Sequence, residues 1–312
     1  MGEKKHTLLK TVGATAAVGT AAYLGTGYYM FRTAFDLKNS TSKLVKPDVK
    51  RMDETDKEKE DWFSHSTREE SFITSYDGLR LHALRITNHP ESHKWILLNH
   101  GCGGSLSNMM NMCWEADHRD FNVLAIDSRG CGMSEGQYTG LGWNEHYDLI
   151  SWINYVLTFD PDAQIALFGK SMGAATVLNS VGDYLPKNVK CAVSDSAYSE
   201  IKKQLLYSGK KYFNFDCSLL MPSVDLYVKN FLHFSISEVS TNRQLRQSFT
   251  PVLFIHGSED EVVPTSDVFD NYYACSSEKD LYVVEGSGHF GTDKAPGYFD
   301  RVFDFIAKYM GE

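Results

Sequence analysis

The stretch QIALFGKSMGAATVL, at residues 164–178, places one serine between two glycines. Its apolar run IALF predicts a β-strand, and its segment AATVL predicts a helix that follows at once. Such an abrupt turn leaves little room for side chains, and Gly169 and Gly173 supply that room on either side of Ser171. This GxSxG pattern is typical of a nucleophile elbow, which exposes a serine hydroxyl at a strand end. The alternative is a glycine-rich turn in which Ser171 only caps the helix.

Further apolar runs alternate with helical stretches along the rest of the chain. Besides the run in the elbow, they lie at residues 95–98, 123–126, 192–193, 252–255 and 281–284. This alternation predicts an α/β fold, with a mostly parallel central sheet covered by helices on both faces. The segment at residues 71–86 contains two β-type runs joined at Asp77-Gly78, which indicates a hairpin at the start of the folded region.

In parallel sheets of this kind, ligands and catalytic groups gather outside the carboxyl ends of the strands. Five of the predicted strands are followed directly by short glycine-containing segments, which read NHGCGGS, DSRGCGMSEG, GKSMG, HGSEDEVVP and EGSGHF. We therefore expect the functional residues to lie in these five segments.

The serine of the elbow needs two partners for catalysis. A serine hydroxyl is a poor nucleophile unless a base takes its proton, and the base needs an acid that fixes its tautomer. Asp260 follows the run at residues 252–255, and His289 follows the run at residues 281–284. The resulting chain order Ser, Asp, His accompanies this elbow. The sequence therefore predicts Ser171, His289 and Asp260 as a catalytic triad.

The partners also have alternative interpretations. Asp260 is placed to cap the next helix, and Glu259 and Glu261 flank it as rival acids. His100 and His256 each precede a glycine at a strand end, where we expect structural hydrogen bonds. A role as the base is the alternative for either histidine.

Acyl transfer generates an oxyanion that preorganised N–H donors must stabilise. The backbone N–H of Met172, directly after the serine, is one predicted donor, and Cys102 in HGCGG supplies the second, with Gly103 next. The Cys102 thiol is alternatively a nucleophile or redox switch, although no CxxC pair is present. The histidines show no zinc-type spacing, so we expect neither a metal nor a cofactor.

Together, HGCGG, DSRGCGMSEG, GWNEHYD, GKSMGAA, HGSEDEVVP and GSGHF resemble motifs of the α/β-hydrolase superfamily over nearly all of residues 71–312. The sequence is particularly similar to bacterial membrane-anchored or secreted hydrolases that also resemble Bem46-like proteins and the catalytic domain of prolyl oligopeptidases. The resemblance implies a triad of Ser171, Asp260 and His289 and acyl-enzyme chemistry on an ester, thioester or amide. It does not imply a particular substrate, because this fold hosts many functions.

The hydrolase domain is expected to span residues 71–312, with a small helical cap at about 201–250. That connection is longer than is usual between two strands. Its apolar side chains are expected either to line an acyl pocket or to pack the cap onto the domain. They are Tyr207, Tyr212, Phe213, Phe215, Leu219, Leu220, Met221, Tyr227 and Phe231.

The N-terminal part of the chain, residues 1–45, is interpreted as a membrane segment. Residues 11–31 carry no charge and are about as long as a membrane-spanning helix. We favour an uncleaved single-pass anchor in the cell membrane over a signal peptide cleaved at residues 19–21. Basic residues lie on both sides of this segment, so the positive-inside rule does not decide its orientation in the membrane. We place the hydrolase domain on the extracytoplasmic side. The charge-dense residues 46–70 are expected to be a spacer.

The charge balance excludes one class of partner. With 31 basic and 40 acidic residues and a net charge of −9, the chain offers no basic stripe for nucleic acid. The six scattered cysteines are interpreted mostly as free thiols. The leading hypothesis is a serine carboxylesterase acting on short or medium acyl esters. The alternatives are a peptidase of the same fold and a non-catalytic, membrane-tethered binding module.

Overall fold

Eight strands form one sheet in the computed structural model, which describes residues 2–39 and 57–311. The strands are β1 (Arg68–Thr74), β2 (Arg80–Ile86), β3 (Lys94–Asn99), β4 (Asn122–Asp127), β5 (Gln164–Lys170), β6 (Val189–Asp195), β7 (Val252–Gly257) and β8 (Lys279–Val284). They lie in the order β1-β2-β4-β3-β5-β6-β7-β8. β2 pairs antiparallel with β1 and β4, and every other neighbouring pair is parallel.

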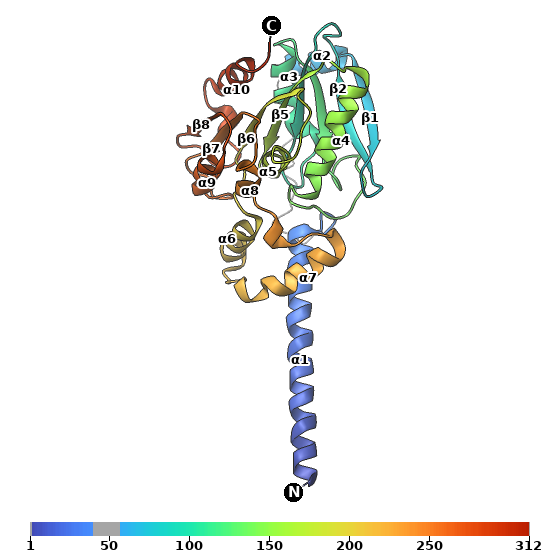
Figure 1. Cartoon of the computed structure of the whole chain (residues 1–312), viewed down its shortest axis with the longest axis vertical. Helices are drawn as coiled ribbons and strands as arrows, with labels where there is room; N and C mark the ends of the chain where they lie inside the picture. The colour runs from blue at the N-terminus through green and yellow to red at the C-terminus, as the bar shows by residue number, and fades with distance from the viewer. Residues whose placement is uncertain (1, 40–56, 312) are drawn as a thin grey trace.

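Helices cover both faces of this sheet (Figure 1). They are α3 (Met110–Asp117), α4 (Asn144–Phe159), α5 (Met172–Ser180), α9 (Ser266–Ala274) and α10 (Tyr298–Ala307), with the short 3₁₀ helices η1 (Leu106–Met109) and η4 (Thr292–Lys294). One core cluster contains side chains of α4, α5 and α9, and the other contains side chains of α3 and α10. Strands buried on both faces must be apolar on both, which explains their continuous apolar runs. The predicted α/β fold is confirmed.

The hairpin at the start of the domain forms where the sequence indicated it. β1 and β2 pair from Arg68 opposite Ile86 to Thr74 opposite Arg80. The turn is closed by the N–H of Ser75, which donates to the carbonyl of Leu79 over 2.8 Å. Gly78 has a φ of +90°, a conformation that costs glycine little.

Helices also fill most of the segment that we expected to form a cap. They are α6 (Ile201–Phe213), η2 (Ser218–Leu220), α7 (Met221–Leu232), η3 (Ile236–Glu238) and α8 (Thr241–Leu245). In Figure 1, α6 and α7 lie beyond the end of the sheet, between the domain and the protruding part of α1 (Gly2–Phe35).

The helix α1 packs on α7 before its C-terminal end reaches the domain. Phe31 of α1 is fully buried, and its ring centroid lies 5.3 Å from that of Phe231 on α7. Gly27 allows the close approach, because a Cβ there would lie 1.9 Å from Oγ of Ser223. α1 therefore contributes to the folded structure as well as preceding it.

The expected membrane-spanning segment, residues 11–31, lies within α1. Its many Gly, Ala and Thr residues are only weakly hydrophobic. Among the helices that the structure describes, none combines the length and the apolarity required to cross a membrane.

The spacer predicted at residues 46–70 needs a correction. Residues 46–56 lie outside the described part of the chain, but α2 (Lys57–His65) is a helix and β1 begins at Arg68. Trp62 of α2 donates a hydrogen bond of 2.7 Å to Asp117, and its ring packs against the core cluster of α3 and α10. The prediction was wrong for this part because it considered the many charges of the segment and not Trp62, which packs on the domain.

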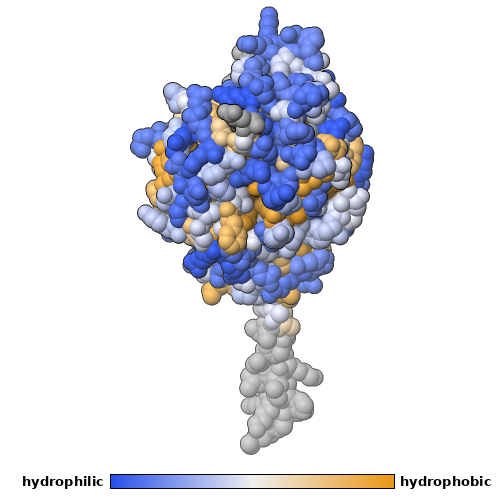
Figure 2. Space-filling view, turned by 45° about the horizontal axis from the view of Figure 1, so that its top comes forward, coloured by the Kyte–Doolittle hydropathy of each residue, from blue (hydrophilic) through white to orange (hydrophobic). Residues whose placement is uncertain are grey.

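The surface in Figure 2 is mostly hydrophilic, and its hydrophobic side chains form small separate patches. Single exposed apolar residues are normal on a folded protein, whereas one large patch would indicate an interface.

Candidate active site

Ser171 sits at a sharp turn between β5 and α5. Its φ of 57° and ψ of −118° are unusual for a residue with a side chain and represent local backbone strain. The turn is tight, because a Cβ on Gly169 would lie 2.1 Å from the carbonyl oxygen of Gly173. The N–H of Ser171 donates to the carbonyl of Asp195 over 2.7 Å, which ties the turn to the end of β6. The serine thus has the geometry of the predicted elbow.

His289 lies in the loop after β8 and contacts both of its predicted partners. Its Nε2 is 2.8 Å from Oγ of Ser171, and its Nδ1 is 2.6 Å from Oδ2 of Asp260. In the neutral tautomer with the proton on Nδ1, the ring donates to Asp260 and accepts from Ser171. The structure therefore brings together three residues that the sequence places far apart.

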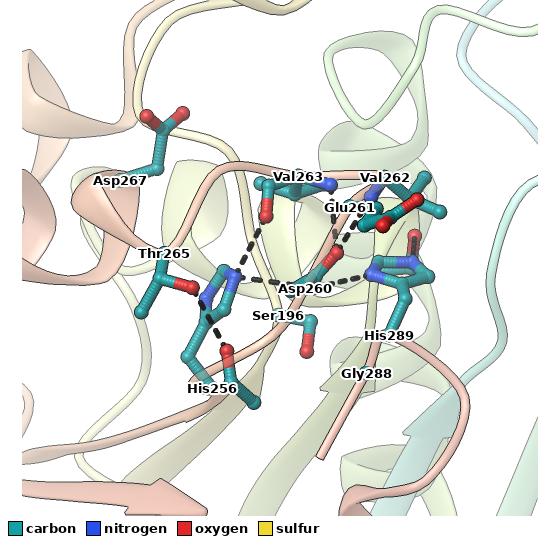
Figure 3. A network of polar contacts seen from close by, with 12 residues as sticks. Ser196, His256, Asp260, Glu261, Val262, Val263, Thr265, Asp267, Gly288 and His289 are labelled. Atoms are coloured by element: carbon teal, nitrogen blue, oxygen red, sulfur yellow. Dashed lines mark hydrogen bonds and ion pairs between the residues drawn. The ribbon is translucent and has the colours of Figure 1, made fainter. Parts of the chain in front are cut away.

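The carboxylate of Asp260 is held by four donors (Figure 3). Oδ1 accepts the N–H groups of Val262 and Val263 over 2.8 and 2.9 Å, while Oδ2 contacts His289 and, at 3.1 Å, Nε2 of His256. Burial opposes ionisation of Asp260, but the hydrogen bonds from His256 and His289 outweigh it and hold its pKa well below the ordinary value. Asp260 is therefore a stable anion beside the imidazole of His289.

The rival acids do not occupy the position of Asp260. Glu261 pairs with Lys211 over 2.9 Å at an exposed position, and the N–H of Glu259 donates to the carbonyl of Ser287.

His100 is fully buried, its Nε2 accepts the N–H of Ser128, and burial lowers its pKa. The expected structural hydrogen bonds of His100 are thus present.

The two predicted oxyanion donors lie on segments that adjoin Ser171. Met172 is the first residue of α5, where backbone N–H groups have no acceptor within the helix. The loop after β3 passes close to the serine, because a Cβ on Gly101 would lie 3.3 Å from Cβ of Ser171. Cys102 follows in that loop, and burial raises the pKa of its thiol. A thiol with a raised pKa is a poor nucleophile, which disfavours the alternative role of Cys102.

His256 forms the structural hydrogen bonds that we expected at its strand end, but the sequence did not predict its partners. Its Nε2 contacts Oδ2 of Asp260 and, at 3.0 Å, the carbonyl of Val263. Lys170, the residue before the serine, was not given a role from the sequence, and it contacts Asp293 at 2.9 Å and Asp195 at 4.0 Å. Its place directly before Ser171 was the signal for Lys170 in the sequence.

Among the residues that the structure describes, no group of three or more His, Cys, Asp or Glu side chains is arranged to hold a metal ion. The arrangement of Ser171, His289 and Asp260 can supply a serine nucleophile, a base and an acid.

The sequence is similar to known proteins, and residues 90–247 match the family described as serine aminopeptidase, S33. The uncharacterized protein YqkD of Bacillus subtilis is 26% identical over 218 residues, covering 70% of this chain and 71% of YqkD. The human α/β hydrolase domain-containing protein 17B is 23% identical over 261 residues, covering 81% of each chain.

Solved structures give the same result for the fold. The esterase Pf2001 of Pyrococcus furiosus superposes with a TM-score of 0.67 at 24% identity and covers 86% of this chain and 98% of its own. Acetyl xylan esterase 1 of Thermoanaerobacterium sp. superposes with a TM-score of 0.60 at 18% identity and covers 84% and 96%. At these identities the similarity establishes a shared fold.

Proposed function

The chain belongs to the serine aminopeptidase S33 family, within the α/β-hydrolase superfamily of serine hydrolases, and from this premise we propose that it hydrolyses carboxylic esters through Ser171, His289 and Asp260. One observation carries the proposal: His289 contacts Ser171 Oγ through Nε2 and Asp260 through Nδ1. Only the order acid, base, nucleophile lets the base take the serine proton while the acid stabilises the resulting imidazolium.

In the proposed first step, Nε2 of His289 takes the proton from Ser171, and Oγ attacks the carbonyl carbon of the ester. Asp260 keeps the reactive tautomer of His289 and stabilises its cation. The N–H groups of Met172 and Cys102 donate hydrogen bonds to the carbonyl oxygen and stabilise the negative charge that develops on it. The tetrahedral intermediate then collapses, and His289 returns the proton to the leaving alcohol.

The second step releases the acid. A water molecule gives a proton to His289 and attacks the acyl-enzyme carbonyl, and the bond to Ser171 Oγ breaks as His289 protonates that oxygen. The same residues serve both steps, so no cofactor is required. Two of the solved structures with this fold are an esterase and an acetyl xylan esterase, which supports the proposal of an ester substrate.

A peptidase is the second candidate, because the family that the chain matches is described as serine aminopeptidase. Such an enzyme must bind the ammonium group of a peptide N-terminus, for which a carboxylate facing the substrate is the natural partner. Asp260, the carboxylate of the proposed triad, already accepts from four donors and is therefore not free to bind an ammonium group. Ester hydrolysis makes no such demand, and we therefore prefer the esterase proposal.

The experiment measures kcat/KM of the full-length protein for nitrophenyl esters and for amino-acid nitroanilides. We expect ester hydrolysis that Ser171→Ala lowers by at least about a thousandfold, since removal of the nucleophile leaves only residual catalysis. The matched control is Ser107→Ala, at an exposed serine near the site. Nitroanilide cleavage without ester cleavage would favour the peptidase. No turnover of either substrate, and no labelling of Ser171 by a fluorophosphonate, would favour a binding module.

A further inference from the structure

The acid of the proposed triad lies between two histidines. In Figure 3, the imidazole rings of His256 and His289 lie on either side of the carboxylate of Asp260. One carboxylate oxygen, Oδ2, is 2.6 Å from Nδ1 of His289 and 3.1 Å from Nε2 of His256. A triad uses one imidazole on its acid, so His256 is a second histidine that the proposed reaction steps leave without a role.

The ring nitrogen Nε2 of His256 carries a hydrogen. It lies beside two acceptors, Oδ2 of Asp260 and, at 3.0 Å, the carbonyl oxygen of Val263. A ring nitrogen between two acceptors must be a donor, in the neutral imidazole as in the charged one. Burial opposes a charge on this ring, but the hydrogen bond with Asp260 outweighs burial and raises the pKa of His256. His256 is therefore a hydrogen-bond donor to Asp260.

Packing alone does not account for a histidine at position 256. The ring is fully buried, and its Nδ1 has no hydrogen-bond partner among the residues that the structure describes. A buried nitrogen without a partner costs free energy, which an apolar side chain of similar size would avoid. What histidine supplies here and an apolar side chain does not is the N–H donor at Nε2.

His256 also differs from the other three donors to Asp260 in its place in the fold. Val262 and Val263 lie in the same loop as Asp260. His289 lies in the loop after β8. His256 belongs to β7 itself, within its parallel pairing with β8. Of these four donors, His256 is thus the one that ties the carboxylate to the central sheet.

The loop of the base is fixed at the same end of β7. The N–H of Glu259 donates to the carbonyl of Ser287 over 2.9 Å, and a Cβ on Gly257 would lie 2.3 Å from that carbonyl oxygen. The loops of the acid and the base are therefore held together directly after His256. With both loops fixed, the orientation of the Asp260 carboxylate decides its geometry with His289.

We propose that His256 is a positioning residue of the triad, whose Nε2–H bond orients the Asp260 carboxylate and draws part of its negative charge away from His289. The inference rests on the proposed ester hydrolysis and adds a control of its working pH. A carboxylate oxygen that is shared with a second donor stabilises the imidazolium of His289 less strongly. His289 therefore remains unprotonated, and able to act as a base, to a lower pH than it would beside Asp260 alone.

Charged groups also face this network from neighbouring elements. Asp195 ends β6, Lys170 ends β5, and Asp293 lies in η4 after the loop of the base. Lys170 pairs with both of these acids. All three residues are unchanged in the variants below, so a difference between variants reports on position 256 itself.

The first test compares two substitutions of His256 in the full-length protein. His256→Leu removes the donor, whereas His256→Gln keeps an amide N–H near the position of Nε2. We expect His256→Leu to lower kcat for nitrophenyl acetate about tenfold and to change KM by less than about twofold, because the acid loses its orientation. The acidic half-maximum of kcat/KM should also move upward by about half a pH unit or more.

His256→Gln should restore both quantities, with kcat within about threefold of the wild type and the acidic half-maximum in its original place. Circular dichroism checks that each variant is folded, and His256→Met takes the place of His256→Leu should the leucine variant unfold. A shift of the pH profile in His256→Gln as large as that in His256→Leu would overturn the proposal, because the N–H donor would then not be what acts on the triad.

The matched control is His146→Leu. His146 is also a buried histidine and contacts a carboxylate, that of Asp183, at 3.1 Å, but it lies beside Ser180 at the C-terminal end of α5. His146→Leu thus removes an imidazole–carboxylate contact away from the triad, and we expect it to leave the pH profile unchanged. The same shift in His146→Leu as in His256→Leu would also overturn the proposal.

Protonation of His289 itself separates this inference from the proposed function. NMR of ¹⁵N-labelled histidine follows it in the full-length protein, with His289→Gln to assign the signal. We expect His289 to take up its proton in His256→Leu at a pH higher by about half a unit or more than in the wild type.

The NMR titration and the kinetics fail in different ways. If no ester is hydrolysed but the NMR shift is present, the proposed function fails and the action of His256 on the triad stands. If esters are hydrolysed but neither the NMR titration nor the kinetic profile changes in His256→Leu, His256 does not act on the triad and ester hydrolysis stands.

Discussion

At the scale of single residues, the site depends on contacts between side chains that lie far apart in the sequence. Ser171, Asp260 and His289 were predictable because each follows a predicted strand, and the fold brings strand ends together. The partners of His256 and Lys170 were not predictable, because the paths of the loops determine which acids and carbonyls lie beside them. Lys170 points from the elbow to Asp293, four residues after His289, and so joins the loops that carry the nucleophile and the base.

The depressed pKa of Asp260 predicts a specific effect of pH on stability. A carboxyl with a lowered folded-state pKa stabilises the fold at pH values above its unfolded pKa of about 3.9, and this contribution is lost as the pH falls through the folded value. We expect Asp260→Asn to unfold more easily at neutral pH, by on the order of 2 kcal/mol. Below about pH 4 this difference should shrink.

Urea unfolding between pH 3 and pH 8 checks this expectation. The matched control is Asp162→Asn, at an exposed position, which should stay within about 0.5 kcal/mol of the wild type. A difference for Asp260→Asn that is constant across the whole range would show that the carboxylate charge contributes nothing.

Lys170 gives a second prediction at this scale. Burial opposes its charge, but Asp195 and Asp293 outweigh burial and raise the pKa of Lys170, so the side chain is a cation between two acids. Lys170→Met removes the cation that pairs with Asp195 and Asp293, and we expect this loss to lower the free energy of unfolding by about 3 kcal/mol. Because Asp293 lies in the His289 loop, kcat should also fall several-fold with little change in KM.

Urea unfolding and steady-state kinetics measure both effects, with Lys187→Met as the control at an exposed lysine. Wild-type values of both stability and kcat in Lys170→Met would mean that the ion pairs of Lys170 neither stabilise the fold nor position His289.

At the scale of elements, the sequence was most informative for the sheet. Each predicted apolar run lies inside an observed strand, because a strand buried on both faces tolerates few polar residues. The docking of α1 on α7 was not predictable, since residues 11–31 of a small-residue helix carry no pattern that selects one partner. The helix α2 was missed for the opposite reason, because charges dominate its composition and its apolar contacts with the core come from Trp62 and Phe63.

The contact between α1 and α7 depends on Gly27. We expect Gly27→Leu to displace α1, since its Cβ would overlap Oγ of Ser223. Gly25→Leu is the matched control, because nothing lies within 4 Å of a Cβ at that position. Limited proteolysis should therefore remove α1 from Gly27→Leu at least about tenfold faster than from the wild type, since each 1.4 kcal/mol of lost docking energy raises the undocked population tenfold. Equal cleavage rates for the two variants would show that α1 does not depend on this close packing.

At the scale of the whole molecule, one sheet separates two core clusters, and the cap with α1 lies outside both helix layers. The six cysteines are all free thiols, and they are distributed over the core clusters, the loops and the cap. Cys113 and Cys191 belong to the cluster of α3 and α10, whereas Cys217 and Cys275 belong to the cluster on the other face, which Cys217 joins from the cap. Burial raises the pKa of both Cys113 and Cys191 to about 12, so these thiols do not react while the core is folded.

Thiol alkylation in increasing urea therefore tests whether the molecule unfolds as one unit. The strands between the two clusters are shared, so loss of either cluster exposes the other, and we expect Cys191 and Cys275 to become reactive at the same urea concentration. Cys217 should react at a lower concentration although it is buried in the same cluster as Cys275, because its segment has exposed side chains such as Phe215 and Leu219 and the following helix α7 packs mainly on α1. Mass spectrometry of alkylated peptides gives each midpoint, with fully denatured protein as the reference for complete labelling. Separate midpoints for Cys191 and Cys275 would mean that the two faces of the sheet unfold independently, and a shared midpoint for Cys217 would make the cap part of the cooperative core.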